Sequence, residues 1–342
     1  MKKIIALLMA FIMMLSFAAC SDKPVVDNPE DTPPVAEEVK PEIADPEIAE
    51  FYEKYVSTDK RPVAVMVDND NEDARPQAGL DEAYLVYEMV IEGGSTRFMA
   101  LFNNTNVEKI GPVRSSRHYF LDFVMENDAI YTHFGWSPKA TTDISAFNIN
   151  NINGVLGSDE SVFWRERKHA NDWHSAYTSI EKVTALANKK GYNEKTNHKN
   201  GIKYATEYID VSPMIISEGV SLKYSGYVTS YTYDKDKKVY LKSIGKNPHN
   251  MQNGKTLEFK NVIIMLIADT SLGDGTARRE INTVGSGKGY YFTDGAYEEI
   301  TWSKSSRSAN TEFKKADGTE LIINPGKTII NLFSPSYELT IK

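Results

Sequence analysis

AYLVYEMVIEGGSTRFMALF, residues 83–102, places two apolar, strand-forming runs on either side of Gly93–Gly94. Paired glycines suit tight turns, so this stretch predicts a β-hairpin. PVAVMV, Pro62–Val67, predicts another buried strand, which ends in the polar turn DNDNED, Asp68–Asp73. The hairpin and this strand predict a sheet in the N-terminal half of the chain.

Helix signals alternate with strand signals in the same half. SSRHYFLDFVMEN, residues 115–127, predicts a helix with Ser115 as its N-cap, and AIYTHFGW, residues 129–136, predicts a short strand. Further helices are expected at residues 45–56, 137–147 and 178–190. This mixture indicates a mixed α/β domain over residues 46–216.

Helix signals stop after residue 217. Tyrosines alternate along YSGYVTSYTY, and Asn-Gly and Asp-Gly turns separate β-rich runs such as VIIMLI. Short strands with such turns predict a mostly antiparallel β domain over residues 217–342. The fold class expected for the whole chain is therefore α+β.

The first 45 residues differ from the rest of the chain. Residues 1–20 have two lysines, a long apolar run and small residues before Cys20, as in a bacterial signal peptide. Cys20, the only cysteine, follows Phe-Ala-Ala and predicts lipidation with palmitate-type acyl chains; cleavage at an Ala-x-Ala-like site is the alternative. Residues 21–45 contain five of the 14 prolines and many acids, which predicts an extended tether.

Charge and motifs exclude several functions. Residues 21–60 carry 12 acidic and 4 basic residues, and residues 61–342 carry 35 and 33, so no basic footprint for a nucleic-acid partner exists. The chain has no H-E-x-x-H, G-x-S-x-G or P-loop motif. DNDNED lacks the glycine and glutamate of an EF-hand, so no metal site is assigned, and no cofactor is expected. VGSGKGYYF, Val284–Phe292, fits a β-turn or bulge better than a phosphate loop, because a β-run follows its glycines.

Arginines and histidines gather between residues 97 and 174. Arg114, Ser115 and Arg117 at a helix start, with Arg97 upstream, would suit an anion, because guanidinium groups and free backbone N–H groups favour negative charge there. Ion pairs with Glu88 or Glu92 are the structural alternative. Glu92, His133, Arg167 and His174 are further catalytic or ligand candidates, although His133 also fits a buried core histidine.

Several long motifs occur in the order typical of one family. RPVAVMVDN, ARPQAGLDEAYLVYEMVIEGGSTRFMALF, IGPVRSSRHYFLDFVMENDAIYTHFG and VGSGKGYYFTDG resemble the YerB-like family of bacterial lipoproteins over about residues 61–342. The resemblance implies two domains of unknown function, the first mixed α/β and the second mostly β. The family's EGG-x-TRF motif falls on residues 92–98 and includes Glu92 and Arg97. Its GPVRS-x-R motif falls on residues 111–117 and includes Arg114, Ser115 and Arg117.

Two parts of the chain depart from the family pattern. A motif similar to PHNLYTS falls on residues 173–179, where His174 is kept, Trp173 replaces proline and Ser175 replaces asparagine. A KPHxD-like pattern falls near His249, where Asn250 stands in the acidic position. These departures put an acid–base role in doubt.

The expected function is that of an extracytoplasmic protein held at the cell membrane through lipid on Cys20. It would bind an anionic cell-wall polymer, a peptide carboxylate or another envelope protein. A cell-envelope hydrolase or transferase is one alternative, with Arg97, Arg114 and Arg117 stabilising charge and His174 or His133 as base. A non-catalytic interaction protein that uses the aromatic β-strands is the other. The sequence does not decide whether the protein is an enzyme.

Overall fold

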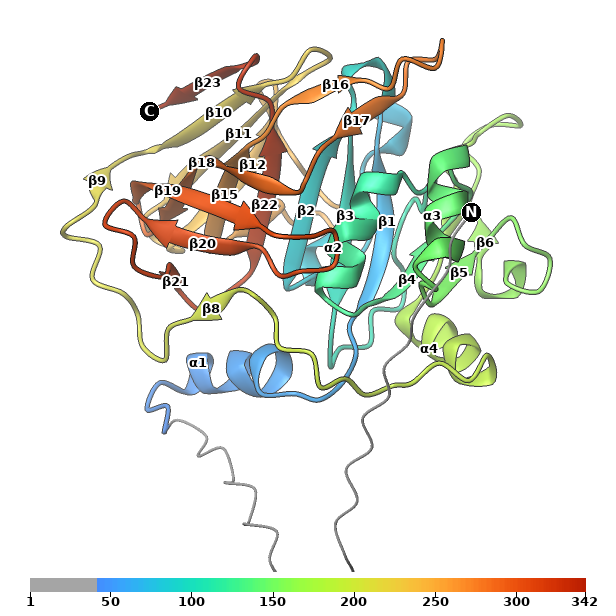
Figure 1. Cartoon of the computed structure of the whole chain (residues 1–342), viewed down its shortest axis with the longest axis horizontal. Helices are drawn as coiled ribbons and strands as arrows, with labels where there is room; N and C mark the ends of the chain where they lie inside the picture. Colours follow the sequence, from blue (N-terminus) through green and yellow to red (C-terminus); the bar gives the residue numbers. More distant parts are fainter. Residues whose placement is uncertain (1–41) are drawn as a thin grey trace, which may run out of the picture. The chain divides into compact units, whose positions relative to one another are not determined.

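The computed structural model of the protein describes residues 42–342, which belong to one compact unit (Figure 1). The predicted signal peptide at residues 1–20, Cys20 and nearly all of the tether lie outside the described residues. None of the helices within the described range combines the length and apolar character needed to cross a bilayer.

The hairpin predicted from residues 83–102 is present. Strands β2 (Leu85–Val90) and β3 (Thr96–Phe102) pair antiparallel. Gly93 and Gly94 both have positive φ in the turn, and Ser225 leaves no room for a side chain on Gly94. Glycine is therefore required at Gly94 by both backbone conformation and packing.

This hairpin lies inside an 11-stranded central sheet that contains both halves of the sequence. Its spatial order is β20 (Glu312–Lys315), β19 (Ala296–Lys304), β18 (Gly285–Thr293), β15 (Asn261–Leu266), β22 (Thr328–Phe333), β2, β3, β1 (Val63–Asn69), β4 (Ile130–His133) and β5 (Asn151–Asn153), with β9 (Ile215–Ile216) paired to β19. The halves join where β2 pairs in parallel with β22.

The second sheet is built from the C-terminal half alone and is antiparallel, as the sequence predicted. It has six strands: β13 (Asn247–Pro248), β12 (Val239–Ile244), β11 (Val228–Asp234), β10 (Gly219–Lys223) and β23 (Glu338–Ile341) in order, with β14 (Glu258–Phe259) beside β12. Three two-stranded ribbons complete the β-structure: β6 (Trp164–Arg165) with β7 (Ala176–Tyr177), β8 (Lys203–Tyr204) with β21 (Ile322–Ile323), and β16 (Asp269–Ser271) with β17 (Arg279–Ile281).

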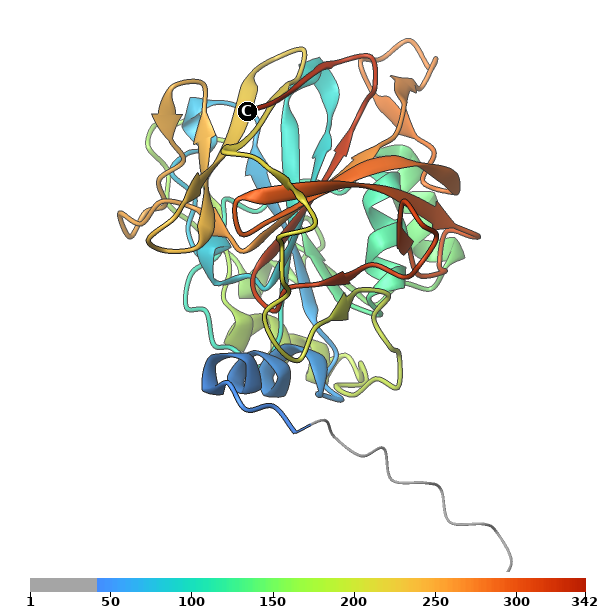
Figure 2. The ribbon, with the colours of Figure 1, turned by 90° about the vertical axis from the view of Figure 1, so that its left-hand side faces the viewer.

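Both faces of the central sheet are covered. Successive side chains of a strand point to opposite faces, so Tyr87 and Glu88 of β2 mark the two sides. The Tyr87 ring lies 4.6 Å from the Phe123 ring of α2 (Leu121–Glu126), whereas Glu88 bonds to Tyr231 and Lys242 of the second sheet. Figure 2 shows α2 on one side of β2 and β3 and the second sheet on the other. Every residue of β2 and β22 is buried between them.

The helices are short. Besides α2, they are α1 (Pro46–Phe51), which continues as a π-helical turn over Tyr52–Val56, α3 (Pro138–Ala146) and α4 (Ile180–Lys189). The side chain of Asp45 caps α1, Ser137 caps α3 and Ser179 caps α4. Single 3-10 turns cover Glu72–Ala74, Leu80–Glu82, Glu92–Gly94, His118–Phe120 and Glu160–Val162.

The helix expected from Ser115 begins later, and Ser115 is not its N-cap. Helical structure starts with the 3-10 turn at His118, and α2 follows from Leu121. The Ser115 hydroxyl donates to the Phe134 carbonyl at 3.1 Å. The backbone N–H of Arg114 donates to Met66 of β1, which holds this stretch extended beside the sheet. The six-residue α2 therefore does not present its N-terminus to a ligand beside Ser115.

The glycine-rich stretch around Lys288 is a regular part of β18, neither a turn nor a phosphate loop. A side chain on Gly287 would meet the Trp302 ring, and one on Gly289 would meet the Ile264 carbonyl. The glycines therefore permit close packing between neighbouring strands.

Residues from both sides of residue 217 contribute to one hydrophobic core. It contains Val65 and Tyr87 from the first half and Ile264 and Ile330 from the second. The boundary predicted at residue 217 therefore does not separate two hydrophobic cores, because residues on both sides of it share one core. The division into domains at residues 46–216 and 217–342 stays a prediction.

Candidate functional site

Three of the predicted residues meet around a carboxylate that was not predicted. Asp68, at the end of β1, is fully buried. Its Oδ2 lies 2.6 Å from Nδ1 of His174 and 2.8 Å from Nε of Arg114, and its Oδ1 lies 3.7 Å from Nη2 of Arg97. We call Asp68, Arg97, Arg114 and His174 the Asp68 centre.

Strand pairing builds this centre. In the β1–β3 register, Asp68 lies opposite Arg97. Val113 bridges to Val67 of β1, which places Arg114 beside the same strand end. The carboxylate of Asp172 accepts the backbone N–H groups of Lys168 and His174 and so fixes the loop that carries His174.

The charges make Asp68 a stable anion. Burial is the largest single influence and raises the pKa of a carboxyl, but the His174 hydrogen bond and the charges of Arg97 and Arg114 together hold the pKa of Asp68 below its usual value. An ionised Asp68 only accepts hydrogen bonds, so Nδ1 of His174 carries a proton. Asn71 lies 3.4 Å from Nε2 on the other side of that ring.

Positive charge continues outward from the centre. The Arg114 side chain is 26% exposed and donates from Nη1 to the Trp173 carbonyl at 3.3 Å. Trp173 is itself 69% exposed. Burial lowers the pKa of Arg165, and repulsion by Arg167 and Arg114 lowers it further, while Glu160 and Asp172 oppose this effect. We call Arg114, Arg165, Arg167 and Trp173 the arginine face.

Arg117 lies outside the Asp68 centre and pairs with Glu92. This ion pair is the alternative to an anion site that the sequence analysis gave. Its Nε and Nη2 donate to the two carboxylate oxygens of Glu92 at 2.7 and 2.8 Å. Burial raises the pKa of Glu92 as its largest influence, yet the Arg117 contacts bring the net pKa below the usual value. Arg117 and Glu92 therefore satisfy each other.

His133 is a buried core histidine with two hydrogen-bonding neighbours. Nδ1 lies 2.7 Å from the Gly135 carbonyl and Nε2 lies 3.3 Å from Oδ1 of Asn151. Burial lowers the pKa of His133 to about 4. His133 makes none of the contacts that define the Asp68 centre.

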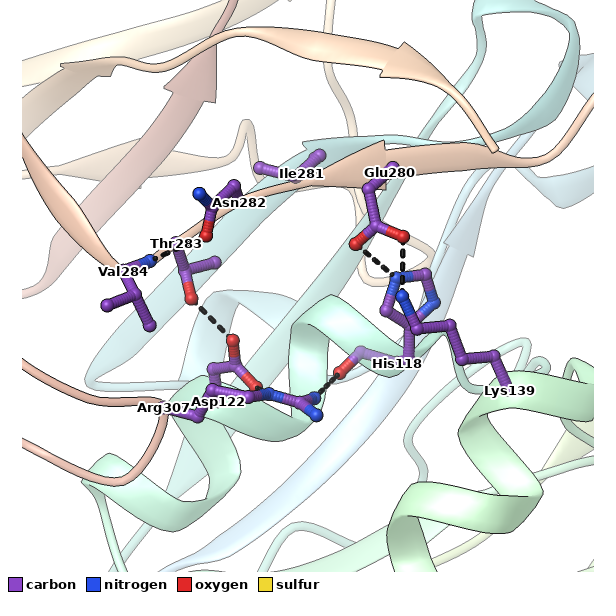
Figure 3. A pocket seen from close by; sticks show the side chains of 9 residues that line it. All are labelled: His118, Asp122, Lys139, Glu280, Ile281, Asn282, Thr283, Val284 and Arg307. Carbon is purple, nitrogen blue, oxygen red and sulfur yellow. Dashed lines mark hydrogen bonds and ion pairs between the residues drawn. The ribbon is translucent and has the colours of Figure 1, made fainter. Parts of the chain in front are cut away.

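A second polar cluster was not predicted as a site. A cavity of about 160 Å³ is lined by His118, Asp122, Lys139, Glu280, Ile281, Asn282, Thr283, Val284 and Arg307 (Figure 3). Burial raises the pKa of Asp122 and lowers the pKa of His118. Acids with shifted pKa values in a cavity often mark functional sites. The sequence could not show this cluster because its members come from distant parts of the chain.

A metal centre has no support within residues 42–342. That range contains no group of three or more His, Cys, Asp or Glu side chains arranged to hold a metal ion. DNDNED forms the end of β1 and the 3-10 turn at Glu72–Ala74.

Comparisons with known families cover both halves of the sequence. Residues 52–193 match the family model described as "Protein of unknown function (DUF3048) N-terminal domain", and residues 220–330 match its C-terminal domain model. The chain therefore belongs to the YerB-like family, which has both of these domains.

A particular relative is a Bacillus subtilis (strain 168) protein named "Putative lipoprotein YerB". The two are 36% identical over 280 residues, which cover 80% of this chain and 82% of the relative. The crystal structure of YerB from Bacillus subtilis is similar, with a TM-score of 0.71 and 31% identity over 82% of this chain and 94% of that one. The α+β fold is thus shared with a solved structure.

Proposed function

We propose that the protein is an extracytoplasmic lipoprotein that binds an anionic group of a cell-envelope component at the arginine face. The observation that carries this proposal is a charge imbalance. Asp68 is shared by Arg97, Arg114 and His174, while Arg165 and Arg167 add two further cations. Asp172 and Glu160 also act on Arg165, so three carboxylates oppose four arginines and the group keeps a net positive charge.

The arginines keep donors for a ligand. A guanidinium has five N–H donors. Arg114 uses Nη1 on the Trp173 carbonyl and faces Asp68 with Nε, and Arg165 uses Nη1 on Ser175. The Arg165 guanidinium stacks 4.3 Å from the Phe134 ring centre, which orients its fork. The remaining N–H groups suit the oxygens of a phosphate or carboxylate.

Exposed arginines give the sharpest test, because their removal spares the buried centre. Arg167→Gln and Arg165→Gln should weaken binding of inorganic phosphate or acetate by roughly 10- to 150-fold, since a hydrogen bond to a charged group contributes about 1.5–3 kcal/mol. Isothermal titration of both anions distinguishes a phosphate from a carboxylate ligand. Lys182→Gln on α4, another exposed cation, is the matched control. Equal affinity in all variants and wild type would contradict the proposal.

Attachment through Cys20 is a separate part of the proposal. It rests on the position of the only cysteine after the apolar run and on the name of the Bacillus subtilis relative. Cys20→Ser should move the protein from the membrane fraction to the soluble fraction after cell fractionation. Membrane association that survives this substitution would contradict the lipid anchor.

An envelope hydrolase or transferase is the second candidate, favoured by the Asp68–His174 pair. A carboxylate that orients an imidazole recurs in catalytic triads. His174→Gln should abolish any turnover of envelope substrates but leave anion binding at the exposed arginines. Unchanged turnover in this variant would exclude His174 as the base.

A further inference from the structure

The cavity in Figure 3 is lined by residues from both halves of the sequence. His118, Asp122 and Lys139 come from the 3-10 turn before α2, from α2 and from α3. Glu280 lies on β17, Thr283 follows it, and Arg307 follows β19. The cavity shares no residue with the arginine face.

Its charges form two poles, each containing a carboxylate and a cation. At the Glu280 pole, Oε1 lies 2.8 Å from Nε2 of His118 and Oε2 lies 2.5 Å from Nζ of Lys139. At the Asp122 pole, Oδ1 lies 2.6 Å from Nε of Arg307, and Oδ2 accepts from the Thr283 hydroxyl. Figure 3 shows the two poles on opposite sides of the cavity.

Each pole can accept a ligand without losing these bonds. A carboxylate has about four lone-pair sites, and both Glu280 and Asp122 use two of them. Lys139 has three N–H donors and uses one, on Glu280. Arg307 has five and uses three, on Asp122, Asp143 and the His118 carbonyl. Donors and acceptors therefore remain at both ends.

The cavity as a whole carries about one net negative charge. Asp122, Asp143 and Glu280 oppose Lys139 and Arg307, and burial lowers the pKa of His118 so that its ring favours the neutral form. A simple anion would gain no net attraction from such a site, whereas a positive group could bond to the remaining lone pairs of Glu280. A negative group on the same ligand could then accept from the remaining N–H donors of Arg307.

We propose that this cavity binds a small zwitterion, a free amino acid with its α-ammonium and α-carboxylate groups. The α-ammonium would donate to Glu280 and the α-carboxylate would accept from Arg307. Ile281 and Val284 line the wall and leave an apolar surface for a small side chain. The volume of about 160 Å³ is below the roughly 300 Å³ of small drug-sized pockets, which suits a ligand of the size of a small amino acid.

Isothermal titration of the protein with glycine and L-alanine tests the proposal, with acetate and methylammonium as single-charge probes. We expect the zwitterions to bind at least about tenfold more tightly than either ion. Glu280→Gln and Lys139→Gln should each weaken glycine binding, and Glu181→Gln and Lys182→Gln on α4 are matched surface controls. Melting temperatures without ligand show that the variants are folded.

Amide NMR shifts of the wild type provide a readout that needs no variant. Added alanine should shift the amides of Glu280 and Thr283 in a saturable way. Acetate binding as tight as that of alanine would overturn the proposal in favour of an anion site. No saturable shift with either amino acid would overturn it outright, and neither result would affect the arginine face.

Discussion

At the scale of single residues, His133 makes a measurable prediction about pH. Burial lowers its pKa from 6.5 to about 4, so the folded state keeps the ring neutral where the unfolded chain takes up a proton. The contribution of the neutral His133 ring to the free energy of unfolding is fully present above pH 6.5. About 3 kcal/mol of this contribution is lost as the pH falls towards 4. Buried His118 and His249 also have lowered pKa values and add to the same loss.

His133→Gln should therefore flatten the decline in unfolding free energy between pH 6.5 and pH 4. Urea denaturation across that range measures the slope, which is independent of any packing loss at neutral pH. Exposed His198→Gln is the control and should keep the wild-type slope. A His133→Gln slope as steep as that of the wild type would show that His133 is protonated in the folded protein.

The sequence predicted the residue types of the candidate site better than their partners. Arg97, Arg114 and His174 do meet, but around Asp68, which was interpreted as part of a solvated turn. A helix pattern follows Ser115 and predicts an N-cap there, yet the hydrogen bonds of Arg114 to β1 and of Ser115 to Phe134 keep this stretch extended. Such contacts depend on long-range pairing, which local patterns do not contain.

At the scale of elements, a buried ion pair joins the two sheets. Nζ of Lys242 on β12 lies 2.9 Å from Oε2 of Glu88 on β2, and both side chains are fully buried. Tyr231 and Thr229 complete the bonding of the lysine, and Thr96 and Tyr227 bond to Glu88. Burial lowers the pKa of Lys242, although Glu88 opposes this effect.

Lys242→Met should destabilise the protein by about 3–5 kcal/mol, because it leaves a buried carboxylate without its cation. The double variant, Lys242→Met with Glu88→Gln, should lose less free energy of unfolding than the two single variants lose in sum. Urea denaturation measures each free energy of unfolding. Lys223, which pairs with Glu338 on the surface, gives the control: Lys223→Met should have little effect. A similarly small effect of Lys242→Met would contradict the buried pair.

Elements with strong local signals were predicted well. The β2–β3 hairpin, α3 and α4 lie within a few residues of the ranges expected from the glycine turn and the local helix patterns. The parallel pairing of β2 with β22 was not predicted, since its partners Leu85 and Thr328 lie far apart in the sequence. The second sheet was expected as antiparallel β, but its packing on Glu88 was not.

At the scale of the whole molecule, the central sheet shared by both halves of the sequence predicts how fragments of the chain unfold. β22 pairs on one side with β15 and on the other with β2, so residues 217–342 alone would expose one edge of β22 and the face of the second sheet that covers β2. We expect this fragment to lack a cooperative thermal transition, while residues 42–342 melt in one step. Circular dichroism and calorimetry measure both. A fragment that melts cooperatively would instead support an independent β domain.

Anion binding at the arginine face is the central functional claim, and anomalous diffraction tests it most directly. Selenate has the shape of sulfate or phosphate, and its selenium gives an anomalous signal that identifies the ion in a crystal. Crystals of the protein soaked in selenate should show an anomalous peak within hydrogen-bonding distance of Arg114, Arg165 or Arg167, and crystals of Arg167→Gln should show a weaker one. Soaked crystals in which the arginine face is accessible to solvent but carries no peak would contradict the account.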